Sequence, residues 1–219
     1  MSMNFERARF NMVEQQVRPW DVLDSRVLDL LEKIHREDFV PVKYRKLAFA
    51  DLAIPLANGQ CMMKPVVEGR LLQALELKPD ETALEIGTGS GFLTACLAHL
   101  ANHVVSVELF DDLSAEAGAR LNDLGLGNVE LSVGDALAGW QPEHAHDVVV
   151  VTGSVPEVPD VFRGWVNPGG RLFVVKGESP AMSACLLTRT GVAEWREECL
   201  FETDLQRLVG AEPPPKFEF

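Results

Sequence analysis

From residue 82 onward, short apolar runs alternate with longer amphipathic segments, and this alternation constrains the fold more than any other feature of the sequence. The apolar runs predict strands, and the segments between them predict helices. The predicted strands cover residues 82–87, 103–109, 129–134, 145–153 and 171–177, and the predicted helices cover residues 91–101, 111–125 and 158–170, the last stopped by Pro168-Gly169-Gly170. This succession implies right-handed crossovers, a parallel sheet and helices on both of its faces.

The two ends of the chain depart from this alternation. After Ser179-Pro180, the runs 183–190 and 193–203 lie on either side of Gly191 and predict an antiparallel hairpin at one sheet edge. Before residue 82, the sequence predicts helices over 5–17 and 24–34, an ordered loop region over 35–63, and a helix that Pro65 begins and Lys78-Pro79-Asp80 ends. We therefore expect one doubly wound α/β domain with a mostly parallel sheet of seven strands.

Composition and charge narrow the class of protein. With 219 residues, 47% of them hydrophobic, the chain is able to bury one sizeable core. A net charge of -13 disfavours binding to nucleic acid phosphates or to an anionic membrane surface. The sequence has neither an apolar stretch near the roughly twenty residues of a membrane span nor a secretory h-region, so we expect a cytoplasmic protein. The four cysteines form no CxxC pair, which predicts reduced thiols.

The segment LEIGTGSGF, residues 84–92, joins the first of these strands to its helix. Glycines at 87, 89 and 91 lack a Cβ atom, so the backbone is able to turn sharply and to approach a ligand closely. The free N–H groups at the start of the following helix favour an anion or a carboxylate. The loop therefore indicates a nucleotide-like ligand, although a tight strand-to-helix turn also uses glycine for steric reasons alone.

Three carboxylates strengthen this interpretation. Glu108 ends the second strand of the alternation, 19 residues after Gly89, where a carboxylate is able to accept both hydroxyls of a ribose. Asp135 follows the third strand, where it or the adjoining backbone meets an adenine amino group. Glu85 lies inside the first strand and needs a partner, either the loop N–H groups or an ammonium of the ligand. Together they describe a site for an adenosine-containing molecule.

These residues resemble the motifs of class I methyltransferases, which bind S-adenosyl-L-methionine. The resemblance rests on ExGxGxG at residues 85–91, the acid at Glu108 and Gly134-Asp135. The spacing GxGxG, in place of GxGxxG, argues against a dinucleotide-binding oxidoreductase. The resemblance implies a Rossmann-like methyltransferase core over residues 81–210, an N-terminal helical and loop cap over 1–80 in the same domain, and an extended tail over 211–219.

A longer set of motifs is similar to the protein-L-isoaspartate O-methyltransferase family, from about residue 10 to residue 177. The motifs are REDFVP at 36–41, Tyr44, ADLAIPLANGQ at 50–60, LEIGTGSGF, GDALAGW at 134–140, DVVVVTG at 147–153 and NPGGRL at 167–172. The resemblance implies carboxyl methylation of isoaspartyl residues in damaged proteins or peptides, with neither nucleic acid nor membrane as partner. It implies donor contacts from Gln60, Glu85, Gly87, Thr88, Gly89, Ser90, Gly91, Glu108, Leu109, Gly134, Asp135, Ala136 and Thr152.

One segment departs from that family's pattern. The family carries GQTISxP where this chain has Gly59-Gln60-Cys61-Met62-Met63-Lys64-Pro65, so Cys61 and Met63 stand at the two catalytic hydroxyl positions. Thioether and thiol groups make the pocket more apolar, which disfavours an incoming carboxylate, and Lys64 is a candidate to compensate. Two alternatives therefore stay open: a divergent bacterial methyltransferase with another acceptor, and a non-catalytic S-adenosylmethionine-binding protein. The oligomeric state is not predicted.

Overall fold

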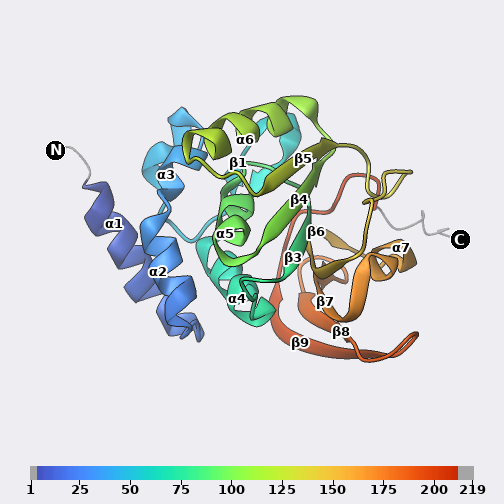
Figure 1. Ribbon diagram of the computed structural model, residues 1–219. Helices are drawn as coiled ribbons and strands as arrows, with labels where there is room; N and C mark the ends of the chain where they lie inside the picture. Colours follow the sequence, from blue (N-terminus) through green and yellow to red (C-terminus); the bar gives the residue numbers. More distant parts are fainter. Residues whose placement is uncertain (1–3, 212–219) are drawn as a thin grey trace, which may run out of the picture.

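The computed structural model describes residues 4–211 and contains a seven-stranded sheet of order β5-β4-β3-β6-β7-β8-β9 (Figure 1). The strands of this sheet are β3 (Thr82–Ile86), β4 (His103–Glu108), β5 (Val129–Val133), β6 (His146–Val155), β7 (Val166–Lys176), β8 (Met182–Arg189) and β9 (Trp195–Thr203). The pairs from β5 to β7 are parallel, whereas β7 with β8 and β8 with β9 are antiparallel. The predicted fold class is confirmed.

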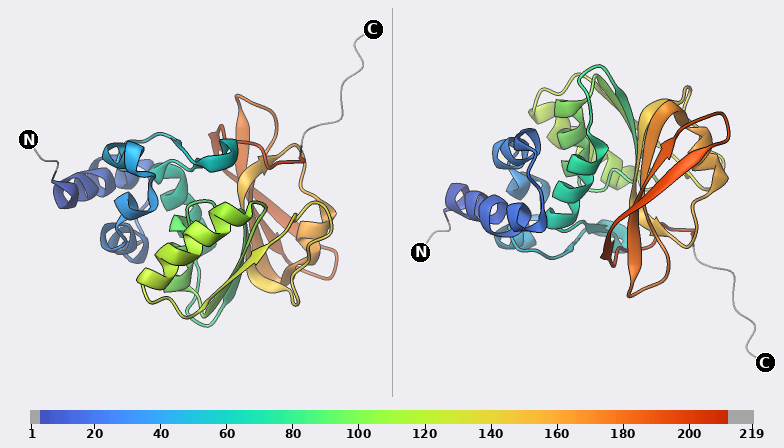
Figure 2. Two further views of the ribbon diagram at one scale, coloured as in Figure 1. Left: turned by 90° about the horizontal axis from the view of Figure 1, so that it is seen from above. Right: turned by 90° about the horizontal axis from the view of Figure 1, so that it is seen from below.

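Seven α-helices accompany the strands in the described chain. They are α1 (Phe5–Met12), α2 (Ser25–Lys33), α3 (Arg36–Phe39), α4 (Pro65–Leu75), α5 (Phe92–Leu100), α6 (Asp111–Asp123) and α7 (Asp160–Gly164). The N-terminal helices lie at one end of the molecule and the β8–β9 hairpin lies at the other (Figure 2). No helix among residues 4–211 is long and apolar enough to cross a membrane.

The core lies in two layers because successive residues of a strand point to opposite faces. Val148 and Val150 of β6 belong to a cluster with α4, α5 and the N-terminal helices. Val149 and Val151 belong to a second cluster, in which Phe162 of α7 and its neighbour Trp165 cover the other face. Burial on both faces explains why the central strands read as unbroken apolar runs.

The N-terminal predictions hold with one refinement. The helix expected over 5–17 is α1 continued by a π-helical turn, Val13–Val17. The helix expected over 24–34 is α2, in which the Asp24 side chain accepts a hydrogen bond from the backbone N–H of Arg26 at 2.9 Å. Such capping satisfies one of the N–H groups that a helix leaves unpaired at its start.

Two predictions about secondary structure were wrong. The loop region expected over 35–63 contains α3, a 3-10 helix (Val42–Leu47) and a two-stranded sheet of β1 (Ile54–Pro55) and β2 (Cys61–Met62). The helix expected over 158–170 is only the five residues of α7, and the Pro168-Gly169-Gly170 stop lies inside β7. A Cβ atom on Gly170 would lie 2.6 Å from the carbonyl oxygen of Asp147, so close pairing with the neighbouring strand excludes a larger residue there.

The edge hairpin is confirmed as β8 and β9, with β9 at the edge of the sheet. The division into a cap over residues 1–80 and a core over 81–210 stays a prediction. The predicted extended tail falls outside the described residues, apart from Ala211.

Candidate functional site

A cavity opens beside the carboxyl ends of β3, β4 and β6, the edge at which α/β sheets of this kind bind ligands. All predicted donor residues except Gly91 line it, together with Cys61 and Met63. Gly91 instead precedes α5 with φ 85°, and a Cβ atom there would lie 3.0 Å from the Cβ of Ala117. Gly91 therefore shapes the loop from outside the cavity.

The glycine loop has the backbone geometry that its sequence suggested. Gly87 and Gly89 have φ values of 96° and 54°, a region that side chains with a Cβ atom rarely adopt. A Cβ atom on Gly87 would also lie 2.3 Å from Oγ1 of Thr152. The Thr152 hydroxyl lies 2.7 Å from the carbonyl oxygen of Gly87, to which it donates. Thr152 on β6 thus holds the loop in place.

Glu108 lies at the end of β4 and is 5% exposed. Its Oε2 accepts a hydrogen bond from the backbone N–H of Gly89 at 2.8 Å, and its Oε1 accepts one from that of Phe110 at 3.2 Å. The same carboxylate that was predicted to hold a ribose therefore also ties the glycine loop to β4.

Glu85 is completely buried under the loop. Its Oε2 accepts hydrogen bonds from the hydroxyls of Thr94 at 2.5 Å and Ser106 at 2.6 Å, so hydroxyls are the partners seen, not the loop N–H groups. Its Oε1 has no partner among the described residues. Burial raises the pKa of Glu85 to about 8, because removal from water penalises the charged form. The unpartnered Oε1 is able to form a hydrogen bond with a ligand group, and a cationic group there would stabilise the ionised carboxylate.

Asp135 follows β5 in a tight turn. Its Oδ1 accepts hydrogen bonds from the backbone N–H groups of Leu137 at 2.8 Å and Ala138 at 3.1 Å. The preceding Gly134 packs under Trp140, whose ring carbon Cδ1 would lie 2.5 Å from a Cβ atom at that position. The turn therefore places Asp135 and Ala136 on the cavity wall by local hydrogen bonding and close packing.

Cys61 and Met63 reach the cavity from the segment that begins with β2. Burial raises the pKa of the Cys61 thiol, and Met63 is 5% exposed. The guanidinium of Arg36, itself completely buried, donates to the carbonyl oxygen of Met63 at 2.6 Å and also pairs with Glu68. Lys64 does not line the cavity, which weakens its candidacy as a carboxylate partner.

The sequence interpretation missed the segment 205–209, which closes one side of the cavity. The segment is held against β6, because Ser154 donates to the carbonyl of Gln206 at 2.8 Å and accepts from the N–H of Leu208 at 2.9 Å. The Gln206 side chain also donates to the carbonyl of Gly59 at 2.7 Å, just before the Cys61 segment. No periodicity marks this stretch as ligand-facing, so only the fold reveals it.

Within that segment, Arg207 is the positively charged residue that lines the cavity in the described chain. Its Nη1 is buried and has no hydrogen-bond partner among the described residues. A buried guanidinium nitrogen without a partner is unfavourable, so an incoming anion would stabilise it.

Comparison with known proteins connects this geometry to a family. Residues 8–196 match the family model of protein-L-isoaspartate(D-aspartate) O-methyltransferase (PCMT). A protein-L-isoaspartate O-methyltransferase of Rhodopseudomonas palustris is 37% identical over 202 residues, which are 92% of this chain and 93% of the relative. One from a Synechococcus strain is 41% identical over 180 residues, 82% of this chain and 73% of the relative.

A solved structure supports the fold independently. It is a Plasmodium falciparum protein described as a protein-L-isoaspartate O-methyltransferase in complex with S-adenosyl-L-homocysteine, with a TM-score of 0.77, 18% identity, and coverage of 94% of this chain and 99% of that one. At this identity the likeness concerns the fold. The matches of sequence over nearly the whole length decide the family: the chain belongs to the protein-L-isoaspartate(D-aspartate) O-methyltransferase family.

Proposed function

We propose that the chain transfers the methyl group of S-adenosyl-L-methionine to the free carboxylate of isoaspartyl residues in damaged proteins or peptides. The observation that carries the proposal is the family match, because residues 8–196 include every predicted donor residue and both positions of the family's hydroxyl groups. S-adenosyl-L-methionine is the methyl donor of this family.

The cavity offers a complementary group for each part of the donor. The Glu108 carboxylate accepts the ribose hydroxyls, Asp135 or its adjoining backbone meets the adenine amino group, and the unpartnered Oε1 of Glu85 accepts the ammonium, directly or through water. The loop glycines allow the backbone to approach the donor closely. These roles are supported by the residues' common presence in the lining of one cavity.

Methyl transfer to a carboxylate requires no general base from the protein. The acceptor is already ionised at neutral pH, so its oxygen attacks the methyl carbon in line while the carbon–sulfur bond of the sulfonium breaks. The products are a methyl ester and S-adenosyl-L-homocysteine. Alignment of acceptor and donor and exclusion of water are then the main contributions of the site.

We further propose that Arg207 aligns the acceptor carboxylate in this chain. The family's hydroxyl positions are occupied by Cys61 and Met63, neither of which is a strong hydrogen-bond donor. Arg207 lines the same cavity, and its Nη1 lacks a partner among the described residues. A guanidinium binds carboxylates with two parallel hydrogen bonds, which fixes orientation as well as position.

Protein or peptide substrates and a cytoplasmic location are part of the same proposal. Damaged proteins are the substrates of this family. The net charge of -13 supports the exclusion of nucleic acid as a partner.

The central test is transfer of a tritiated methyl group from the donor to an isoaspartyl peptide and to its aspartyl twin. We expect label only in the isoaspartyl peptide. Calorimetry should show binding of S-adenosyl-L-homocysteine, weakened by about 1 to 3 kcal/mol in Glu108→Ala. Donor binding without transfer to either peptide would favour another acceptor or a non-catalytic role, the two alternatives that the hydroxyl-free Cys61 and Met63 support. Absence of donor binding would overturn the proposal as a whole.

Arg207 has its own test. In Arg207→Gln we expect KM for the isoaspartyl peptide to rise about tenfold or more with little change in donor affinity, since one charge-assisted hydrogen bond is worth about 1.5 to 3 kcal/mol. Arg207→Lys should retain part of the activity. A second measurement uses a competing peptide in which an amide replaces the isoaspartyl carboxylate. This amide peptide should inhibit the wild type only weakly, and the difference between carboxylate and amide peptides should be smaller in Arg207→Gln. An unchanged preference for carboxylate over amide in Arg207→Gln would rule out this role.

A further inference from the structure

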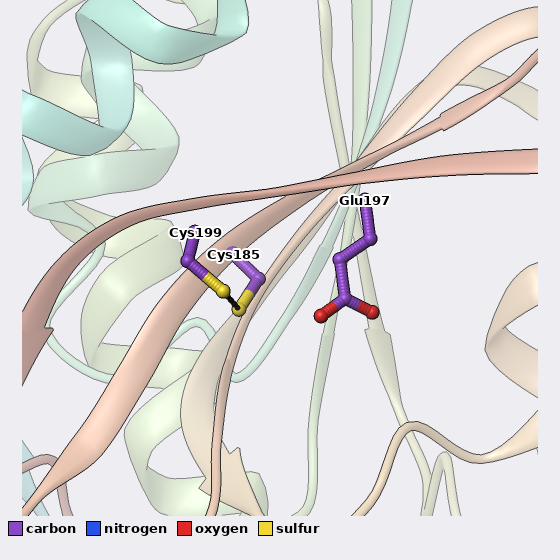
Figure 3. A group of neighbouring side chains, drawn as sticks. All are labelled: Cys185, Glu197 and Cys199. Carbon is purple, nitrogen blue, oxygen red and sulfur yellow. Dashed lines mark hydrogen bonds between the residues drawn. The ribbon is translucent and has the colours of Figure 1, made fainter.

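Two cysteines lie opposite each other on the edge hairpin, and neither of them lines the donor cavity. Cys185 of β8 pairs directly with Cys199 of β9, and their Sγ atoms are 3.4 Å apart (Figure 3). Both are free thiols. The other two cysteines are separate from this pair: Cys61 lines the donor cavity and Cys96 lies in α5.

The backbone places the two sulfur atoms at bonding reach. Directly opposed residues of an antiparallel pair have Cα atoms roughly 4.5 to 5.5 Å apart, inside the range that a disulfide requires. A register irregularity lies between Ala184 and Cys185, where β9 carries one extra residue. Such a bulge increases the local twist and adjusts how the side chains are aimed. Closing the pair therefore needs side-chain rotation more than movement of the strands.

The two thiols differ in access to solvent. Cys185 is completely buried in the cluster under α7, whereas Cys199 is exposed and lines a surface hollow with Lys176 and Ser183. Burial and the hydrogen bond with Cys199 raise the pKa of Cys185 to about 12. Nearby charges are the ammonium of Lys176 and the carboxylate of Glu197, which form an ion pair at 2.6 Å. Cys199 is consequently the thiol that a dissolved reagent meets first.

We propose that Cys185 and Cys199 form a reversible covalent modification site, at which a small-molecule disulfide such as oxidised glutathione converts the two thiols into an intramolecular disulfide. The geometry that supports this is the direct cross-strand pairing with one exposed and one buried thiol. The exposed Cys199 reacts first with the reagent, and the buried Cys185 then displaces the glutathione that is bound to Cys199.

The reaction proceeds by two thiol–disulfide exchanges. The Cys199 thiolate attacks one sulfur of oxidised glutathione, the glutathione sulfur–sulfur bond breaks, and one glutathione thiolate leaves. Cys185 then loses its proton and attacks Sγ of Cys199, which releases the second glutathione thiolate. Two electrons pass from the protein thiols to the reagent, and the two thiol protons end on the two reduced glutathione molecules.

The test is equilibration of the full chain in buffers of reduced and oxidised glutathione, followed by acid quenching, alkylation of free thiols after unfolding, and mass spectrometry with peptide mapping. In oxidising buffer we expect two of the four cysteines to escape alkylation, with the peptides of Cys185 and Cys199 joined. Dithiothreitol should restore all of them. Because the wild-type chain alone gives this result, the test does not depend on a variant's folding.

Variants separate the two steps. Cys185→Ser should accumulate one glutathione on Cys199, since the displacing thiol is absent, whereas Cys199→Ser should leave Cys185 unmodified. Cys61→Ser is the matched control and should form the same linkage as the wild type. Persistent glutathione on wild-type Cys199, or full alkylation after oxidation, would overturn the proposal. The proposal would also be overturned if the purified chain contained one equivalent of zinc that is lost in Glu197→Gln. In that case Cys185, Glu197 and Cys199 would form a metal site.

Discussion

Glu85 combines complete burial, two hydroxyl donors on Oε2 and an Oε1 without a partner in the described chain. Its pKa of about 8, against an ordinary value of 4.5, means that the folded protein holds a proton there that the unfolded chain has released. The contribution to stability is therefore present at low pH and is lost as pH rises toward 8. A bound ammonium reverses this preference, because it stabilises the ionised carboxylate.

This linkage gives the first prediction. Between pH 4.5 and 8, the free energy of unfolding of the ligand-free protein should fall by a Glu85 contribution on the order of 4 kcal/mol, and Glu85→Gln should remove it. Donor affinity should rise over the same range in the wild type and stay flat in Glu85→Gln. Denaturant titrations and calorimetry at several pH values measure both. Equal pH dependence of wild type and variant would show that Glu85 keeps its charge state throughout.

Cys61 and Met63 support a second prediction. The double change Cys61→Thr with Met63→Ser should raise methyl transfer to an isoaspartyl peptide about tenfold, since a hydrogen bond made in the transition state is worth about 1.4 kcal/mol. Donor affinity should change little, because the glycine loop and Glu108 are untouched. Initial rates with tritiated donor provide the measurement. A slower double variant would mean that the thiol and thioether are adapted parts of a working site.

We expect donor binding to depend most on the glycine loop between β3 and α5. Gly87→Ala would place a Cβ atom 2.3 Å from Oγ1 of Thr152 and would impose a φ of 96° on a residue that rarely adopts it. We expect a loss of stability of about 1 to 3 kcal/mol and at least tenfold weaker binding of S-adenosyl-L-homocysteine.

Two further variants make this third prediction specific. Gly127→Ala, where an added Cβ atom meets nothing within 4 Å, should behave as the wild type. Adding Thr152→Ala to Gly87→Ala should recover part of the stability, since it removes the clashing oxygen but not the strained φ. Thermal unfolding and calorimetry distinguish these variants. Wild-type donor affinity in Gly87→Ala would show that the loop relaxes without cost.

Among the helices and strands, those with a clear local pattern of apolar residues could be predicted from the sequence. The strands β3, β4 and β6 were predicted because most of their residues are apolar and buried, which leaves a short apolar run in the sequence. β1 and β2 were not predicted, because a strand of two residues is too short to show an alternating pattern. Residues 166–170 belong to β7 because Val166 pairs with His146 of β6. This pairing joins distant parts of the chain and cannot be predicted from local sequence.

The same distinction holds for the candidate site. The residues predicted to bind the donor cluster at strand ends, where Glu85, Gly87 and Glu108 follow recognisable spacings. Arg207 reaches the cavity only because segment 205–209 pairs alongside β6, and Cys185 meets Cys199 only because two strands align. Contacts of this kind depend on tertiary structure and leave no spacing signal in one sequence.

Across the whole molecule, Arg36 and Glu68 link α3 to α4 through a buried ion pair. Arg36 of α3 pairs with Glu68 of α4, donates to the carbonyl oxygens of Ala48 and Met63, and lies over the ring of Phe92 in α5. Both charged side chains are buried, at 0% and 2% exposure. One buried ion pair therefore connects three helices and the segment that carries Cys61 and Met63.

Breaking that pair should affect the fold and the site together. Glu68→Ala leaves the Arg36 guanidinium buried without its carboxylate, and we expect a loss of about 3 to 5 kcal/mol of stability with reduced methyl transfer. Replacing both partners, Arg36→Met with Glu68→Leu, should cost less stability because no unpaired charge remains, although Met63 loses its anchor and activity should stay low. The pair of the exposed Glu116 with the half-buried Arg120 is the control, since Glu116→Ala should cost less than about 1 kcal/mol. Denaturant unfolding and methyl transfer rates test this fourth prediction, and equal costs for Glu68→Ala and Glu116→Ala would show that the buried pair does not hold the N-terminal region in place.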